Sequence, residues 1–98
     1  MFVAIHHNIK DTQKWDQAVK TLMAAMEQGS LPQGVKPLMY LPAKDGRRAD
    51  CVWEAESAEA LKAFLEPATS IAAQNEYIPL NAQAAIGLPA QEPATATA

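Results

Sequence analysis

Two prolines lie inside strand-like segments, and they constrain the fold more than any other feature of this chain. Pro37 and Pro79 interrupt two of four such segments, whereas residues 2–7 and 50–55 contain no proline. Proline has no N–H group to donate to a sheet ladder, so it is tolerated mainly on edge strands. The sequence therefore predicts two edge strands that contain proline and two central strands that do not.

Helical periodicity separates these strands. Apolar residues recur at spacings of three and four after Asp11, where Asp11 or the next residue can cap a helix that ends at Gly29. A second apolar stripe follows Ser57, which provides its cap, and continues across Pro67. We expect Pro67 to kink this second helix or to start another short one. A single short helical turn is predicted over residues 81–87.

The predicted elements follow the order strand, helix, strand, strand, helix, strand. The strands are expected near residues 2–7, 35–41, 49–55 and 76–80. This order is typical of an α+β, ferredoxin-like βαββαβ fold, with an antiparallel sheet of strand order 4-1-3-2 and both helices on one face. We expect this domain to span residues 1–88. Residues 89–98, rich in proline, alanine and threonine, are expected to be a disordered tail.

The sequence Asp45-Gly46 is a strong hairpin signal between the second and third strands. A turn centred there sets the predicted pairs, which are Tyr40 with Cys51 and Leu38 with Trp53 on the helix side, and Met39 with Val52 and Pro37 with Glu54 on the other. The helix-facing side is expected to hold Val3, Ile5, Cys51, Trp53, Ile78 and Leu80. The open face, which is the side of the sheet without helices, is expected to hold Phe2, Ala4, His6, Met39, Leu41, Val52, Tyr77 and Pro79. So apolar a surface is unfavourable in water, and we expect a second copy of the chain to cover it in a homodimer.

The run Cys51-Val52-Trp53-Glu54-Ala55-Glu56-Ser57-Ala58-Glu59-Ala60-Leu61 is similar to the junction between third strand and second helix in the dimeric α/β-barrel superfamily. It resembles in particular a small nickel-binding, ferredoxin-like family. The resemblance covers residues 1–86 and implies that two subunits pack their open faces into a barrel. The superfamily includes cofactor-free monooxygenases, lactone isomerases, cyclases, haem-degrading enzymes and members without known activity. The chain lacks the asparagine and tryptophan placement of the haem-degrading and quinone-forming members, so no catalytic residue is transferred.

The predicted sheet brings three polar side chains together at one end of the open face. His6, Asp50 and Tyr77 form the candidate catalytic site, in which Asp50 would orient the imidazole and Tyr77 would stabilise an oxyanion. Such a site could abstract a proton from a phenol or enol without a bound metal, and no cofactor is expected. Glu54 lies deeper on the same face, where burial would raise its pKa and make it an alternative base.

Two other interpretations of these residues stay open. In the first, they are structural: His6 is a satisfied strand-end residue, Asp50 caps a turn, Tyr77 fills an interface, and Glu54 pairs with a cation across the dimer. In the second, His6 with Glu54 or Asp50, doubled by the dimer, binds nickel or zinc. His6 and His7 point to opposite faces and cannot readily chelate one ion together. We expect His7 to be a polar core residue bonded to the backbone.

Charge and composition exclude several classes of protein. The net charge is −3, and the only adjacent basic pair, Arg47-Arg48, lies in the predicted turn, so no nucleic-acid surface is expected. The single cysteine, Cys51, excludes an intramolecular disulfide and fits a reducing compartment. No apolar stretch approaches the roughly 20 residues that a membrane helix needs. Because no secretory signal pattern is present, we expect a cytoplasmic protein.

Three functional classes remain. The first is a protein that binds a small organic molecule in the barrel, with or without cofactor-independent proton transfer or oxygenase chemistry, so whether it is an enzyme is left open. The second is a metal-binding protein, and the third is a structural dimerisation module. A closed apolar cavity containing His6 would favour the first class.

Overall fold

The computed structural model describes residues 1–89 and has the predicted order of elements. These are β1 (Phe2–Ile9), α1 (Thr12–Glu27), β2 (Lys36–Pro42), β3 (Arg48–Glu54), α2 (Ala58–Thr69) and β4 (Ala73–Pro79). The predicted tail lies outside the described residues except for Pro89. The α+β, ferredoxin-like topology is therefore confirmed.

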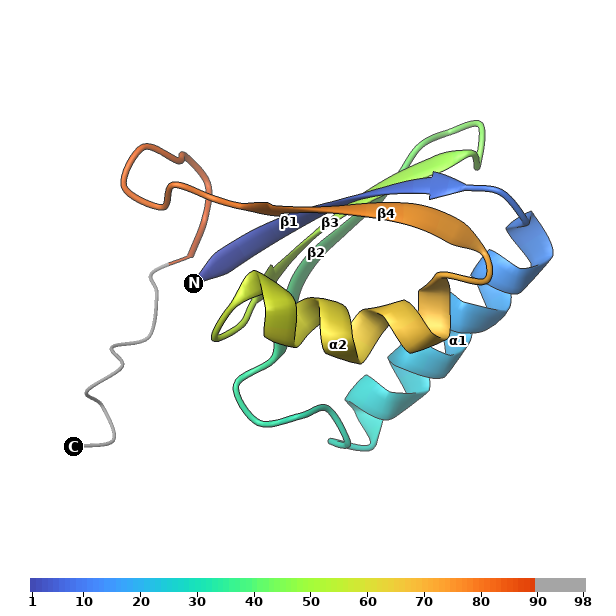
Figure 1. The fold of residues 1–98 in the computed structure, drawn as a ribbon, viewed down its shortest axis with the longest axis horizontal. Coiled ribbons are helices and arrows are strands. Elements are labelled where there is room, and N and C mark those ends of the chain that lie inside the picture. The colour runs from blue at the N-terminus through green and yellow to red at the C-terminus, as the bar shows by residue number, and fades with distance from the viewer. Residues whose placement is uncertain (90–98) are drawn as a thin grey trace.

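The four strands form one antiparallel sheet in the order β2-β3-β1-β4. Both helices lie on the same face of this sheet and leave the other face open (Figure 1). Pro37 lies in β2 and Pro79 in β4, which are the two edge strands. The missing proline N–H groups thus fall where they disturb the ladder least, as the sequence predicted.

Local capping sets the ends of the helices. The side chain of Asp11 accepts a hydrogen bond from the Lys14 N–H at 3.0 Å, and Gly29 follows α1 with a φ of 68°. Ser57 accepts from the Ala60 N–H at 3.0 Å and begins α2. Pro67 starts no new helix, because it lies inside α2, two residues before the helix ends at Thr69.

The hairpin register follows the prediction near the turn and departs from it further along β2. Tyr40 lies opposite Cys51 and Met39 opposite Val52, as predicted. A bulge between Pro37 and Met39 then shifts the register by one residue. The predicted pairs Leu38 with Trp53 and Pro37 with Glu54 are therefore wrong. Pro37 lies opposite Trp53, and Lys36 opposite Glu54.

The faces of β4 are the main error of the sequence prediction. Tyr77 lies opposite Ile5, which places Tyr77 and Pro79 on the helix-facing side, whereas Ile78 lies opposite Ala4 on the open face. The strand also begins at Ala73, three residues earlier than predicted. Alternation alone does not say which side of an edge strand faces the helices. Here the hydrogen bond from the Tyr77 hydroxyl to Glu66 of α2 accompanies the inward orientation.

The core fills the space between the sheet and the helices. One cluster of buried side chains consists of Val3, Ile5, Cys51, Trp53, Ala55, Leu61 and Leu65, and a second consists of Ile9, Trp15, Ala49, Ala72 and Ala73. Beyond β4, the N–H groups of Ala84 and Ala85 both bond to the Asn81 carbonyl, which forms the predicted single turn. None of the helices in residues 1–89 is long and apolar enough to cross a membrane.

Candidate functional site

The structure brings together one pair of the predicted site residues. His6 and Asp50 are cross-strand neighbours on the open face, and His6 Nδ1 lies 2.5 Å from Asp50 Oδ1. Both side chains are 54% exposed. They lie in an open polar hollow that also includes Arg48 and Glu76. The pair is therefore a solvated surface interaction.

Tyr77 and Glu54 do not join this pair. Tyr77 lies on the helix-facing side of the sheet, where its hydroxyl donates to Glu66 Oε1 at 2.9 Å. Glu54 shares the open face but lies opposite Phe2, four residues from His6 along β1, which is about 13 Å at the usual rise of a strand. The predicted four-residue site is thus not assembled within one chain.

Of the proposed metal ligands, Asp50 lies beside His6, whereas Glu54 is separated from it. The same strand geometry keeps the carboxylate of Glu54 away from the His6 ring. Within residues 1–89, no group of three or more His, Cys, Asp or Glu side chains is arranged to hold a metal ion.

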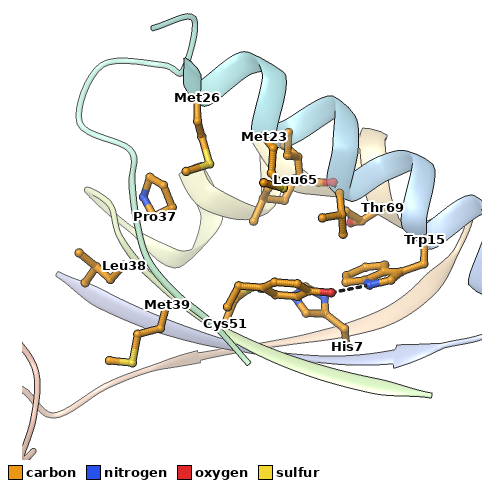
Figure 2. A pocket seen from close by; sticks show the side chains of 13 residues that line it. His7, Trp15, Met23, Met26, Pro37, Leu38, Met39, Cys51, Leu65 and Thr69 are labelled. Carbon is orange, nitrogen blue, oxygen red and sulfur yellow. Dashed lines mark hydrogen bonds between the residues drawn. The ribbon is translucent and has the colours of Figure 1, made fainter. Parts of the chain in front are cut away.

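A cavity of about 270 Å³ lies on the other side of the sheet, between α1 and strands β2 and β3 (Figure 2). The residues that line it are His7, Trp15, Val19, Leu22, Met23, Met26, Pro37, Leu38, Met39, Tyr40, Cys51, Leu65 and Thr69. Most of these are apolar. Its polar end consists of His7, Tyr40 and Cys51, which come from β1, β2 and β3.

Trp15 connects α1 to this polar end. Its indole N–H donates to the Tyr40 hydroxyl at 3.0 Å, the bond drawn as a dashed line in Figure 2. Its ring also lies 4.6 Å from the His7 ring, centroid to centroid, at an angle of 50°. The Tyr40 oxygen accepts in the bond to Trp15, so the hydroxyl hydrogen remains for donation to another acceptor.

His7 takes part in a hydrogen-bond chain that crosses three strands and reaches α2. Its Nδ1 lies 2.6 Å from Asn75 Oδ1, and its Nε2 lies 2.9 Å from Cys51 Sγ. Asn75 Nδ2 donates to Glu66 Oε1 and to Thr69 Oγ1, each at 2.9 Å. No buried side-chain nitrogen or oxygen within residues 1–89 lacks a partner.

These partners determine the tautomer of His7. The Glu66 carboxylate only accepts hydrogen bonds, so it must face the amide nitrogen of Asn75. The Asn75 oxygen therefore faces His7 and accepts the hydrogen carried by Nδ1. Nε2 then presents a lone pair to the Cys51 thiol.

Burial favours the uncharged forms of His7 and Cys51 near neutral pH. It lowers the pKa of His7, although the hydrogen bond to Asn75 acts in the opposite direction. Burial also raises the pKa of the Cys51 thiol to about 11, against the effect of the Trp53 indole N–H that bonds to its sulfur. Burial and the neighbouring Glu66 carboxylate raise the pKa of Tyr77. Neutral His7 therefore accepts from a protonated thiol.

The sequence prediction located His7 on the correct side but gave it the wrong partner. His7 bonds to two side chains, Asn75 and Cys51, and not to the backbone. The alternation of side chains along β1 predicted this side, because it places His7 on the same face as the buried residues Val3 and Ile5. Asn75 was missed because the fourth strand was predicted to begin one residue after it.

No family model, curated protein or solved structure matches this chain. The resemblance to the dimeric α/β-barrel superfamily therefore stays a prediction.

Proposed function

We propose that this protein binds a small, mainly apolar organic molecule in the cavity between α1 and the sheet. The observation that carries the proposal is a cavity of about 270 Å³ with apolar walls and polar groups gathered at one end. Small-molecule sites typically combine an apolar lining with a few convergent polar groups, at volumes from about 300 Å³ upward. The cavity is near that lower limit and suits a molecule with one ring or a short chain.

The polar end suggests the chemistry of the ligand. None of the described residues that line the cavity is charged, so an ionised ligand would lose its hydration without gaining an opposite charge. The Tyr40 hydroxyl can donate a hydrogen bond, since its bond from Trp15 uses only the oxygen. A neutral molecule that carries one acceptor, such as a ketone or an ester carbonyl, satisfies both conditions.

Two methionines of α1 lie where a ligand could enter the cavity. Met23 and Met26 are both exposed, yet both line the cavity from the C-terminal half of α1 (Figure 2). Unbranched methionine side chains adapt their shape at low cost. They therefore allow entry without a movement of the sheet.

The test compares a small aryl ketone, benzylacetone, with butylbenzene, which has a similar apolar body and no acceptor. We expect calorimetry to detect binding of the ketone, weaker binding of the hydrocarbon, and loss of that difference in Tyr40→Phe. Val19→Trp, which fills the cavity, should abolish binding, whereas His6→Gln on the open face should not change it. Ketone binding that survives Val19→Trp would contradict this location of the site.

We also propose that a second copy of the chain covers the open face. Leu41 is 55% exposed there, and Met39, Val52 and Ile78 share the face and are only partly buried. Light scattering should find a dimer for the natural chain and a monomer for Val52→Arg, with Gln13→Arg, at an exposed position of α1 away from this face, as a control for added charge. A monomeric natural chain at micromolar concentration would contradict the homodimer.

A further inference from the structure

We propose that Cys51, His7 and Asn75 form an acyl-transfer centre at the polar end of the cavity, where the thiol accepts the acyl group of a small apolar ester or thioester. The inference rests on the proposed function, because the acyl donor must first bind in the cavity. It adds a chemical step to what would otherwise be a binding site.

The first argument is the geometry of the three side chains. Cys51 Sγ lies 2.9 Å from His7 Nε2, and His7 Nδ1 lies 2.6 Å from Asn75 Oδ1. Cys51 is the nucleophile, His7 the base and Asn75 the group that orients the base, and each lies within hydrogen-bond distance of the next. They come from three adjacent strands, β3, β1 and β4, so the sheet fixes their spacing.

The second argument is the direction of the hydrogen bonds. Glu66 and Thr69 fix the Asn75 amide so that its oxygen accepts from His7 Nδ1. His7 therefore presents the basic lone pair of Nε2 to the thiol, which is the tautomer that a general base needs. Asn75 acts here as a positioning residue.

The third argument is access. Cys51 is 6% exposed and His7 is 4% exposed, yet both line the cavity. A molecule in the cavity can contact the sulfur, whereas bulk solvent is largely excluded from it. The centre is thus expected to select acyl donors by their size and their lack of charge.

The reaction needs no oxidant or metal. The sulfur of Cys51 attacks the carbonyl carbon and forms a C–S bond, while the thiol proton moves to His7 Nε2. The bond from carbon to the leaving oxygen or sulfur then breaks, and His7 returns the proton to the leaving group. The Trp53 indole N–H, 3.2 Å from Cys51 Sγ, favours negative charge on the sulfur during the attack. The product is a thioester on Cys51.

The experiment uses para-nitrophenyl butyrate and the full chain. We expect release of one nitrophenolate per chain, and peptide mass spectrometry should find one butyryl group on Cys51. Cys51→Ala should form no such adduct, and His7→Gln should slow acylation by about 100-fold, a typical contribution of a general base. His6→Gln is the matched control, because His6 is the next residue on β1 and faces the other side of the sheet. An unmodified Cys51, or equal rates for natural chain and His7→Gln, would overturn the proposal.

The pH profile separates a base from a structural histidine and needs no variant. Without a base, the thiol reacts only as thiolate, so the rate rises tenfold per pH unit toward the thiol pKa of about 11. With His7 as base, the rate is level around neutral pH and falls in acid as His7 becomes protonated. The charged or titratable groups that act on His7 are Asp50, His6 and Glu66, together with Cys51. A tenfold rise per unit from pH 6 to 9 in the natural chain would overturn the proposal.

An unreactive analogue distinguishes the two proposals. The ether para-nitrophenyl butyl ether has the shape of the ester and cannot transfer an acyl group. If the ether binds and Val19→Trp abolishes that binding, but the ester leaves Cys51 unmodified, the acyl-transfer centre is wrong and the binding site stands. If neither compound binds, both proposals fail. Acylation of Cys51 that persists in Val19→Trp would also overturn the centre, because the thiol would be reached by another route.

Discussion

Two neighbouring histidines lie on opposite faces of the sheet, and their environments differ. His6 and His7 are consecutive in β1, and each brings Nδ1 close to a side-chain oxygen of an adjacent strand: Asp50 at 2.5 Å for His6, and Asn75 at 2.6 Å for His7. The side chain of His6 is 54% exposed, whereas His7 is 4% exposed. Nearly identical local geometry therefore exists in water on one side and in the core on the other.

The difference shows that burial, more than the presence of a partner, gives a histidine its chemical character. In water, an exposed contact such as that between His6 and Asp50 contributes little to stability, and solvent satisfies whatever it leaves unpaired. In the core, every polar atom of the His7 chain needs a partner, because a missing bond costs about 1–3 kcal/mol. The buried side thus holds a fixed tautomer beside a cavity, and the open side holds a solvated pair.

The largest expected contrast concerns apolar side chains on the two faces. Leu65 of α2 is buried and lines the cavity, so Leu65→Ala should lower the free energy of unfolding by about 2–5 kcal/mol. Leu41→Ala on the open face should change it by less than about 0.5 kcal/mol in the monomer. Urea denaturation, with the open-face comparison made in the Val52→Arg background, measures both. Similar losses at the two positions would contradict the account of the core.

The next contrast concerns the oxygen partner of each histidine. Asn75→Leu removes the acceptor of His7 Nδ1 and the donor to Glu66, and it should lower the free energy of unfolding by about 2–3 kcal/mol. Asp50→Leu is the matched change on the open face, because it removes the acceptor beside His6 Nδ1, and it should cost less than about 1 kcal/mol. The comparison fails if Asp50→Leu proves the more destabilising of the two.

The pH dependence of stability should also differ between His7 and His6. The pKa of His7 is lower in the folded chain than its ordinary value of 6.5, so the unfolded state binds more protons as the pH falls through that value. Stability should therefore be full above about pH 6.5 and should decrease below it. His7→Gln should flatten this decrease between pH 7 and 5, and His6→Gln should preserve it. Thermal unfolding at a series of pH values measures the effect.

The smallest expected effect is that of the exposed histidine itself. His6→Gln should change the free energy of unfolding by less than about 0.5 kcal/mol, because solvent replaces the lost contact with Asp50. High salt should reduce even this difference. Denaturation curves of the natural chain and the variant at low and high salt check it.

Much of the fold could be predicted from the sequence because its signals are local. Pro37 and Pro79 marked the edge strands, Asp11 and Ser57 marked the helix starts, and the turn at Asp45-Gly46 gave most of the hairpin register. Each signal depends on the backbone chemistry of one or two residues.

The candidate site could not be predicted to the same extent, because it depends on contacts between distant segments. Which side of the sheet Tyr77 faces depends on the position of Glu66 in α2. The partner of His7 depends on where the fourth strand begins. The bulge near Pro37 also shifted one end of β2 by a residue, although the hairpin turn had set the other end correctly. Only tertiary packing determines these three features.

We propose that the functional site lies on the helix-facing side, at His7, and not at His6 on the open face. The most direct test is a two-dimensional spectrum of the ¹⁵N-labelled imidazole rings at neutral pH, recorded with and without benzylacetone. We expect His7 to carry its hydrogen on Nδ1 and its ring signals to move when the ketone is added, while those of His6 stay in place. Movement of the His6 signals with those of His7 unchanged would contradict the account.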